Sequence, residues 1–152
     1  MQDKYFDVVM LIERLHRLFL DVVKAELDQL KVVDISNVQA MILYNIGKNK
    51  LTVGEISNRG YYLGSNVTYN LKKLVENGYI AQEQSPHDRR SSTVKLSKKG
   101  LVIFDQIDKM LKKHLENLPR NNISDEQLQA LHKTMQNLEN FWSFLATRTI
   151  KY

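Results

Sequence analysis

The hydrophobic pattern of this chain changes its period at Gly78, and this change constrains the fold more than any other feature of the sequence. Before Gly78, apolar residues recur at the three- and four-residue steps of amphipathic helices. After it, residues 79–84 and 92–96 have the alternating pattern of strands, and a polar loop at 85–91 separates them. The sequence therefore predicts helices followed by a β-hairpin whose tip carries arginine.

Two helices are expected in the first third of the chain. Residues 4–30 contain no glycine or proline and predict one long amphipathic helix. Residues 37–46 predict a second helix, with Ser36 as its N-cap and Gly47 just past its end.

The next two helices are short and adjacent, as in a helix-turn-helix. Thr52 and Glu55 have the spacing of a capping box, which opens a helix to about residue 59. The following helix begins near Ser65 and stops at Gly78. Its inward face is expected to consist of Val67, Leu71, Leu74 and Val75.

Two long helices are expected after the hairpin. Ser97 caps the first, which ends near residues 118–119, and the capping box of Ser124 and Gln127 opens the second. Apolar residues in the last helix alternate steps of three and four, which is typical of a seam for another helix. We therefore expect residues 1–30 and 101–152 to be dimerisation helices. Their interface residues are expected to be Phe6, Met10, Leu131, Met135, Leu138, Trp142 and Leu145.

Positive charge is concentrated in the centre of the chain. Residues 59–100 hold eight Lys or Arg and three Asp or Glu, and the whole chain of 152 residues has a net charge of +5. A local basic patch favours a polyanionic partner. The chain has no cysteine, which excludes disulfides, thiolate metal sites and thiol-based redox sensing. No apolar run approaches the ~20 residues of a membrane helix, so we expect no membrane partner. Acidic Asp3 and Asp7 occupy the region where a signal peptide would be basic, so we expect a cytoplasmic protein.

These elements predict a single domain of the mainly α class, a winged helix-turn-helix with a small antiparallel β wing, whose DNA-binding lobe spans residues 36–100. The helix that begins near Ser65 has a polar outward face, which suits a major groove about 12 Å wide. Asparagine can pair with adenine, threonine can contact a thymine methyl group, and lysines suit phosphates. The DNA-binding residues expected on this helix are Ser65, Asn66, Thr68, Tyr69, Asn70, Lys72 and Lys73. Considered without the neighbouring hairpin, these polar residues are explained equally well as an ordinary solvated helix face.

The hairpin tip adds four candidate DNA-binding residues, Asp88, Arg89, Arg90 and Ser91. An arginine can enter the narrow minor groove, where the potential is most negative, and a carboxylate can orient it by a salt bridge. We assign the groove contact to Arg90, the orienting role to Asp88 and a phosphate contact to Arg89. Taken alone, the loop is better explained as a plain exposed turn, and the DNA contact gains support only from the polar helix beside it.

Residues 88–100, DRRSSTVKLSKKG, resemble the wing signature of MarR-type regulators, in which Asp-x-Arg precedes an alternating strand, Leu-Thr/Ser and a glycine. Residues 13–18 and 60–75 look similar to a narrower subgroup, the LdtR-like regulators associated with cell-wall L,D-transpeptidase genes. The resemblance implies a homodimeric repressor or activator that binds double-stranded DNA at a pseudo-palindromic operator.

The resemblance also implies a small aromatic or anionic effector that releases the DNA. Its pocket is expected between the first helix, the second helix and the start of the fifth, with His16, Phe19, Tyr44 and Tyr62 as candidate lining residues. Core residues, or residues that shield the base of a dimer, would have the same character, so both interpretations stay open.

Other classes of protein find little support in the sequence. His87, His114 and His132 lack metal-ligand spacing, and the chain has no glycine-rich phosphate loop and no nucleophile elbow. We expect no metal, no cofactor and no enzymatic activity. The main alternative is a winged-helix protein–protein interaction module whose basic face binds an acidic protein. A small enzyme or ligand carrier built on the helices is a second alternative.

Overall fold

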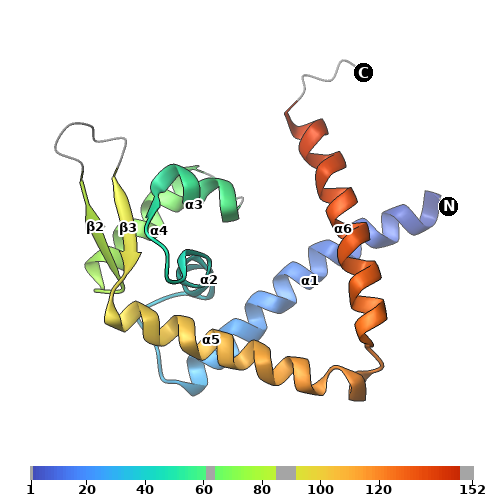
Figure 1. Cartoon of the computed structure of the whole chain (residues 1–152), viewed down its shortest axis with the longest axis horizontal. Helices are drawn as coiled ribbons and strands as arrows, with labels where there is room; N and C mark the ends of the chain where they lie inside the picture. Colours follow the sequence, from blue (N-terminus) through green and yellow to red (C-terminus); the bar gives the residue numbers. More distant parts are fainter. Residues whose placement is uncertain (1, 61–63, 85–91, 148–152) are drawn as a thin grey trace. The chain divides into compact units, whose positions relative to one another are not determined.

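The computed structural model describes residues 2–60, 64–84 and 92–147. Helices predominate, and three short strands form a small antiparallel sheet, which confirms the expected fold class (Figure 1). The elements are α1 (Gln2–Gln29), α2 (Asn37–Ile46), β1 (Leu51–Thr52), α3 (Val53–Gly60), α4 (Gly64–Glu76), β2 (Ile80–Glu83), β3 (Thr93–Leu96), α5 (Lys98–Asn117), the 3-10 helix η2 (Pro119–Asn121) and α6 (Asp125–Ala146). The chain divides into two compact units, residues 1–110 and 111–152, each of which is described by itself.

Reciprocal capping boxes fix the starts of three helices. At α2, Gln39 N donates to Ser36 Oγ (3.1 Å) and Ser36 N donates to Gln39 Oε1 (3.0 Å). Thr52 and Glu55 exchange the same pair of bonds at α3, and Ser124 and Gln127 do so at α6. Each box satisfies two backbone N–H groups that a helix start leaves open, so the predicted helix starts are confirmed.

The sheet has the strand order β1–β3–β2, with both pairs antiparallel. Val94, in the central strand, lies opposite Leu51 on one side and Gln82 on the other. Val94 and Leu96 are 1% and 7% exposed, so the predicted inward face of this strand is confirmed. Strand β1 has only two residues, too few to show an alternating pattern, and the sequence did not indicate it.

The core of the first unit lies under the helix-turn-helix and the wing. Val67 and Leu74 of α4 are completely buried, and Leu71 is 5% exposed, which confirms three of the four residues predicted for the inward face of this helix. The fourth, Val75, is half-buried. The three buried side chains join buried residues of the neighbouring elements, including Leu43 of α2 and Ile56 of α3. Burying side chains of this size contributes roughly 1.5–3 kcal/mol each, so the apolar face fixes which side of α4 points outward.

Apolar side chains remain exposed on α1 and α6. Phe6 and Met10 are 57% and 56% exposed, whereas Val23 and Leu27 near the other end of α1 are buried. Within its described length, α6 buries no residue completely, although Leu138, Trp142 and Leu145 are half-buried. Exposed apolar faces of this extent mark interaction surfaces in soluble proteins. None of the helices in the described ranges is long and apolar enough to cross a membrane.

Candidate nucleic-acid interface

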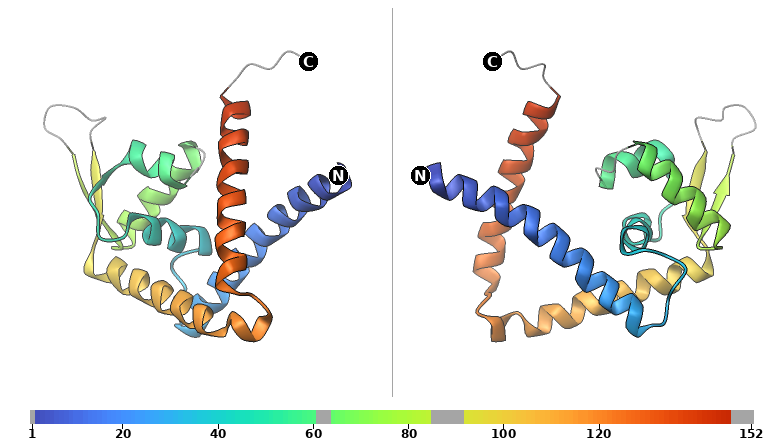
Figure 2. Two further views of the ribbon diagram at one scale, coloured as in Figure 1. Left: turned by 45° about the vertical axis from the view of Figure 1, so that its right-hand side comes forward. Right: turned by 180° about the vertical axis from the view of Figure 1, so that it is seen from behind.

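Helix α4 presents the polar residues predicted for DNA contact on the side opposite its buried face. Asn66, Thr68, Tyr69 and Lys72 are exposed, and Lys73 is half-buried. Ser65 lies in the first turn of α4, and its side chain lies outside the described part of the structure. Helix α4 packs against strand β2 of the hairpin, and Figure 2 shows the helix and the hairpin close together, so the two belong to one region of the first unit.

The two lysines of α4 differ in their electrostatic surroundings. Lys73 Nζ lies 3.5 Å from Glu76 Oε2 and 5.8 Å from the centre of the Tyr69 ring. Lys72 is exposed and forms no ion pair with a carboxylate in the described ranges. Lys72 can bind a phosphate without first breaking an ion pair, so it is the stronger candidate for a contact with the DNA backbone.

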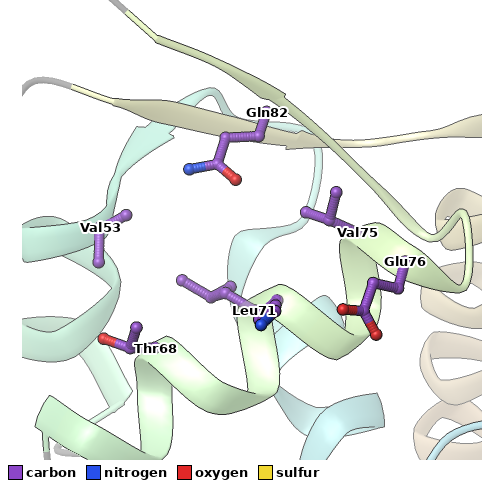
Figure 3. Close-up of a pocket in the computed structure, with 7 residues that line it drawn as sticks. Val53, Thr68, Leu71, Val75, Glu76 and Gln82 are labelled. Atoms are coloured by element: carbon purple, nitrogen blue, oxygen red, sulfur yellow. The ribbon is translucent and has the colours of Figure 1, made fainter. Parts of the chain in front are cut away.

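A groove of about 360 Å³ separates α4 from the wing strand β2 (Figure 3). Leu71 and Val75 of α4 line it from one side, Val53 from α3, and Gln82 from β2. Thr68, Lys72 and Glu76 complete the lining. Two of the predicted DNA-binding residues, Thr68 and Lys72, therefore line the α4 side of this groove.

Side-chain bonds hold the base of the wing. Gln82 Nε2 donates to Ser92 Oγ (2.7 Å), and Lys50 Nζ donates to Glu83 Oε2 (2.7 Å). The bond from Lys50 lowers the pKa of the Glu83 carboxyl below its ordinary value. Glu83 and Thr93 are paired across the two strands, so the loop between them starts and ends at adjacent positions. The predicted tip residues Asp88, Arg89, Arg90 and Ser91 lie outside the described residues.

A second polar cluster ties the end of α4 to the start of α5. The Tyr79 hydroxyl donates to Asp34 Oδ1 (2.6 Å), and Lys99 Nζ lies 3.1 Å from Asp34 Oδ2. Lys99 Nζ also lies 4.3 Å from the centre of the Tyr79 ring. The Tyr79 hydrogen bond lowers the pKa of Asp34, while burial and the bond to Asp34 raise the pKa of Tyr79. The sequence did not point to this cluster, because its members are far apart along the chain.

The candidate effector residues have different surroundings. His16 is exposed on α1, and Phe19 is half-buried. Tyr44 stacks on Phe104, with ring centres 5.0 Å apart, and its hydroxyl donates to Asp108 Oδ1 (3.2 Å). Tyr62 lies outside the described residues. Tyr44 is therefore held between α2 and α5, as a core residue would be.

Two short helices, a third helix with a polar outer face, and an antiparallel hairpin define the winged helix-turn-helix class of DNA-binding proteins. A family model described as MarR family matches residues 33–91 of the chain. The chain is also 36% identical over 138 residues to the exopolysaccharide II synthesis transcriptional activator ExpG of Rhizobium meliloti (strain 1021), a match that covers 91% of this chain and 71% of that protein. The chain belongs to the MarR family.

Solved structures support the same assignment. Streptococcus pneumoniae FabT in complex with DNA has a TM-score of 0.73 and 25% identity, covering 93% of this chain and 99% of that chain. Staphylococcus aureus MarR in complex with salicylate and kanamycin has a TM-score of 0.75 and 25% identity, covering 97% and 94%. These similarities identify the chain as a DNA-binding transcriptional regulator.

Proposed function

We propose that a homodimer of this chain binds a pseudo-palindromic operator, with α4 in the major groove and the 85–91 loop in the adjacent minor groove. The observation that carries this proposal is the division of α4 into a buried apolar face and an exposed polar face beside the hairpin. Recognition helices related by a two-fold axis meet successive major grooves about 34–36 Å apart. The operator is therefore an inverted repeat with half-sites roughly 10 base pairs apart, centre to centre.

Selection of duplexes from a random-sequence pool tests this function and identifies the operator in the same experiment. The enriched duplexes should contain an inverted repeat, and fluorescence anisotropy should show binding roughly 10³-fold or more tighter than to a shuffled duplex. A protein that bound all duplexes alike, with no enriched sequence, would instead support the interaction module for an acidic protein partner.

The exposed apolar faces of α1 and α6 support the dimer. We assign the interface to Phe6, Met10, Leu131, Met135, Leu138, Trp142 and Leu145, of which the first four are more than 40% exposed in the single chain. Covering such side chains removes apolar area from water at about 25 cal/mol per Å². Residues 1–30 and 101–152 accordingly serve as dimerisation helices, and residues 36–100 form the DNA-binding lobe.

Lys72→Ala is expected to weaken binding to operator and shuffled duplexes by similar factors. Its ammonium group has no carboxylate partner among the described residues, so it is assigned to a phosphate, whose contact releases a counterion. The slope of log affinity against log salt concentration should become shallower by about 1, measured by anisotropy at several salt concentrations. Lys24→Ala, which removes an exposed lysine paired with Asp28 on α1, is the matched control and should leave the slope unchanged.

Arg90→Ala is expected to weaken operator binding by about 1–3 kcal/mol and to leave the thermal unfolding midpoint unchanged. The guanidinium is assigned to the minor groove, where the negative potential is strongest. Anisotropy with the selected duplex measures the loss. Arg120→Ala, at an arginine of η2, is the control, and equal affinities for both variants would remove the wing from the mechanism.

A small aromatic or anionic effector is part of the proposal. The structure of Staphylococcus aureus MarR, which is in complex with salicylate and kanamycin, supports it for this family. We assign the effector to His16, Phe19, Tyr44 and Tyr62. Such a ligand can change operator binding only by its different affinities for the DNA-competent and DNA-incompetent forms of the dimer.

We further propose that the chain belongs to the LdtR-like subgroup and controls genes of cell-wall L,D-transpeptidases. The similarity of residues 13–18 and 60–75 supports this assignment. Sequencing the chromosomal fragments bound by the protein in its own cells would show whether the occupied promoters belong to such genes.

A further inference from the structure

Asn70 differs from the other predicted contact residues of α4 because another helix holds its side chain. Asn70 is half-buried, and its Oδ1 accepts a hydrogen bond from Gln39 Nε2 of α2 (3.1 Å). Gln39 itself is buried, with 9% of its surface exposed. The bond joins residues 31 positions apart, so it ties the first turn of α2 directly to the recognition helix.

The capping box of α2 fixes the orientation of the Gln39 amide. The backbone N–H of Ser36 can only donate, so the Gln39 atom that lies 3.0 Å from it must be the oxygen Oε1. The amide nitrogen of Gln39 is then at the other end of the planar group, directed at α4. Because this nitrogen can only donate, Asn70 must present its own oxygen to it.

This chain of bonds leaves the nitrogen of Asn70 as the outward group. Asn70 Nδ2 forms no hydrogen bond with the described residues. Among the described residues, no fully buried side-chain nitrogen or oxygen lacks a hydrogen-bond partner, so Asn70 Nδ2 is not fully buried. Asn70 thus offers two N–H donors at the border of the polar face, while its oxygen is already occupied.

We propose that Gln39 is a positioning residue for DNA recognition, which makes Asn70 a hydrogen-bond donor toward the base edges. A free asparagine pairs with adenine through one donor and one acceptor, whereas a donor-only amide selects acceptors such as N7 and O6 of guanine. The inference rests on the proposed entry of α4 into the major groove. Gln39, which contacts no base, then contributes to the sequence that the protein selects.

Gln39→Glu reverses the direction of the hydrogen bond between residue 39 and Asn70 while keeping the size of the side chain. One carboxylate oxygen still accepts the Ser36 N–H, and the other faces Asn70, which must turn its amide to donate Nδ2 to it. The Asn70 oxygen then points outward and accepts from N4 of cytosine or N6 of adenine. Sequencing of duplexes selected from a random pool by the full-length protein should show a change in base preference on the order of tenfold at one position of each half-site.

Two further variants make the result decisive. Gln127→Glu alters the same position of the capping box of α6, where the side-chain nitrogen has no partner among the described residues, and should leave the selected sequence unchanged. Asn70→Asp keeps the bond from Gln39 but also turns an oxygen outward, so it should shift the preference in the same direction as Gln39→Glu. This variant decides the question if Gln39→Glu does not fold.

If Gln39→Glu folds and selects the same sequence as the wild type, the role of Gln39 is overturned. If Gln39→Glu does not fold, the same sequence selected by Asn70→Asp and the wild type overturns it. A wild-type protein that selects no sequence would instead overturn the proposed function, so the two failures are distinguishable.

Discussion

Gly100→Ala is expected to destabilise the protein by about 3 kcal/mol, the largest stability change that we predict for a single methyl group. Gly100 is buried in the first turn of α5. A Cβ atom on this residue would overlap the carbonyl oxygen of Tyr79 and would also lie 3.3 Å from Leu96 Cβ. Overlap with backbone cannot be relieved by a side-chain rotation, so one of the two segments must move.

The backbone around Tyr79 has little freedom to move. The Tyr79 carbonyl accepts the Ser97 N–H (3.0 Å), and the Ser97 hydroxyl donates to the Gly78 carbonyl (2.6 Å). The Tyr79 side chain is 2% exposed, and Asp34 holds its hydroxyl. Separating α5 from this turn would break these bonds and shift the strand that leads into the wing. The methyl group should therefore reduce operator affinity as well as stability.

Thermal unfolding at a fixed protein concentration measures this effect. A loss of about 3 kcal/mol corresponds to a fall in Tm of roughly 6–12 °C for a chain of this length. Gly54→Ala is the matched control, because a Cβ on this exposed helical glycine would meet only the Thr52 hydroxyl oxygen, at 3.9 Å. This control should be neutral or more stable by about 0.5–1 kcal/mol. Equal Tm values for both variants would contradict the close approach of α5 to Tyr79.

Local sequence signals predicted the helix starts because a cap depends on residues only three positions apart. Ser36 accepts the bond of the predicted N-cap, and Thr52 and Ser124 form the capping boxes that their spacing indicated. The inward face of α4 was also predictable, because burial of its apolar residues follows the helical period. Strand β1 was not predictable from the sequence, because its pairing with β3 depends on residues more than 40 positions away.

The candidate site shows the same division between local and distant interactions. The helical period places Asn66, Thr68 and Lys72 on the outward side of α4, and they are exposed. Asn70 was predicted to belong to the same group. The structure shows that Asn70 differs from the others because its side chain is hydrogen-bonded to Gln39. The helical period places Asn70, three positions from Val67 and four from Leu74, closer to the buried face than Asn66. It does not reveal the bond to Gln39, because that partner lies on another helix.

Leu138→Asp is expected to convert the dimer into a monomer and to weaken operator binding by roughly 10²–10⁴-fold, the advantage that linking two binding modules provides. Leu138 is half-buried on the apolar side of α6, where neighbouring Leu131 and Met135 are 54% and 43% exposed. A carboxylate in a closed apolar interface loses its hydration without gaining a partner, which is strongly unfavourable. A monomer binds only one half-site of the operator and loses the binding free energy of the second.

Light scattering coupled to size-exclusion chromatography measures the mass, and anisotropy measures the affinity for the selected duplex. Asn140→Asp introduces the same charge two residues along α6, about 200° around the helix, and should remain dimeric with unchanged affinity. Circular dichroism separates dissociation from unfolding, because the helical signal of a folded monomer persists. A Leu138→Asp protein that retained the dimer mass and the wild-type affinity would exclude this side of α6 from the interface. The apolar side chains Phe141 and Phe144, each 51% exposed on another side of α6, would then become the surface to test next.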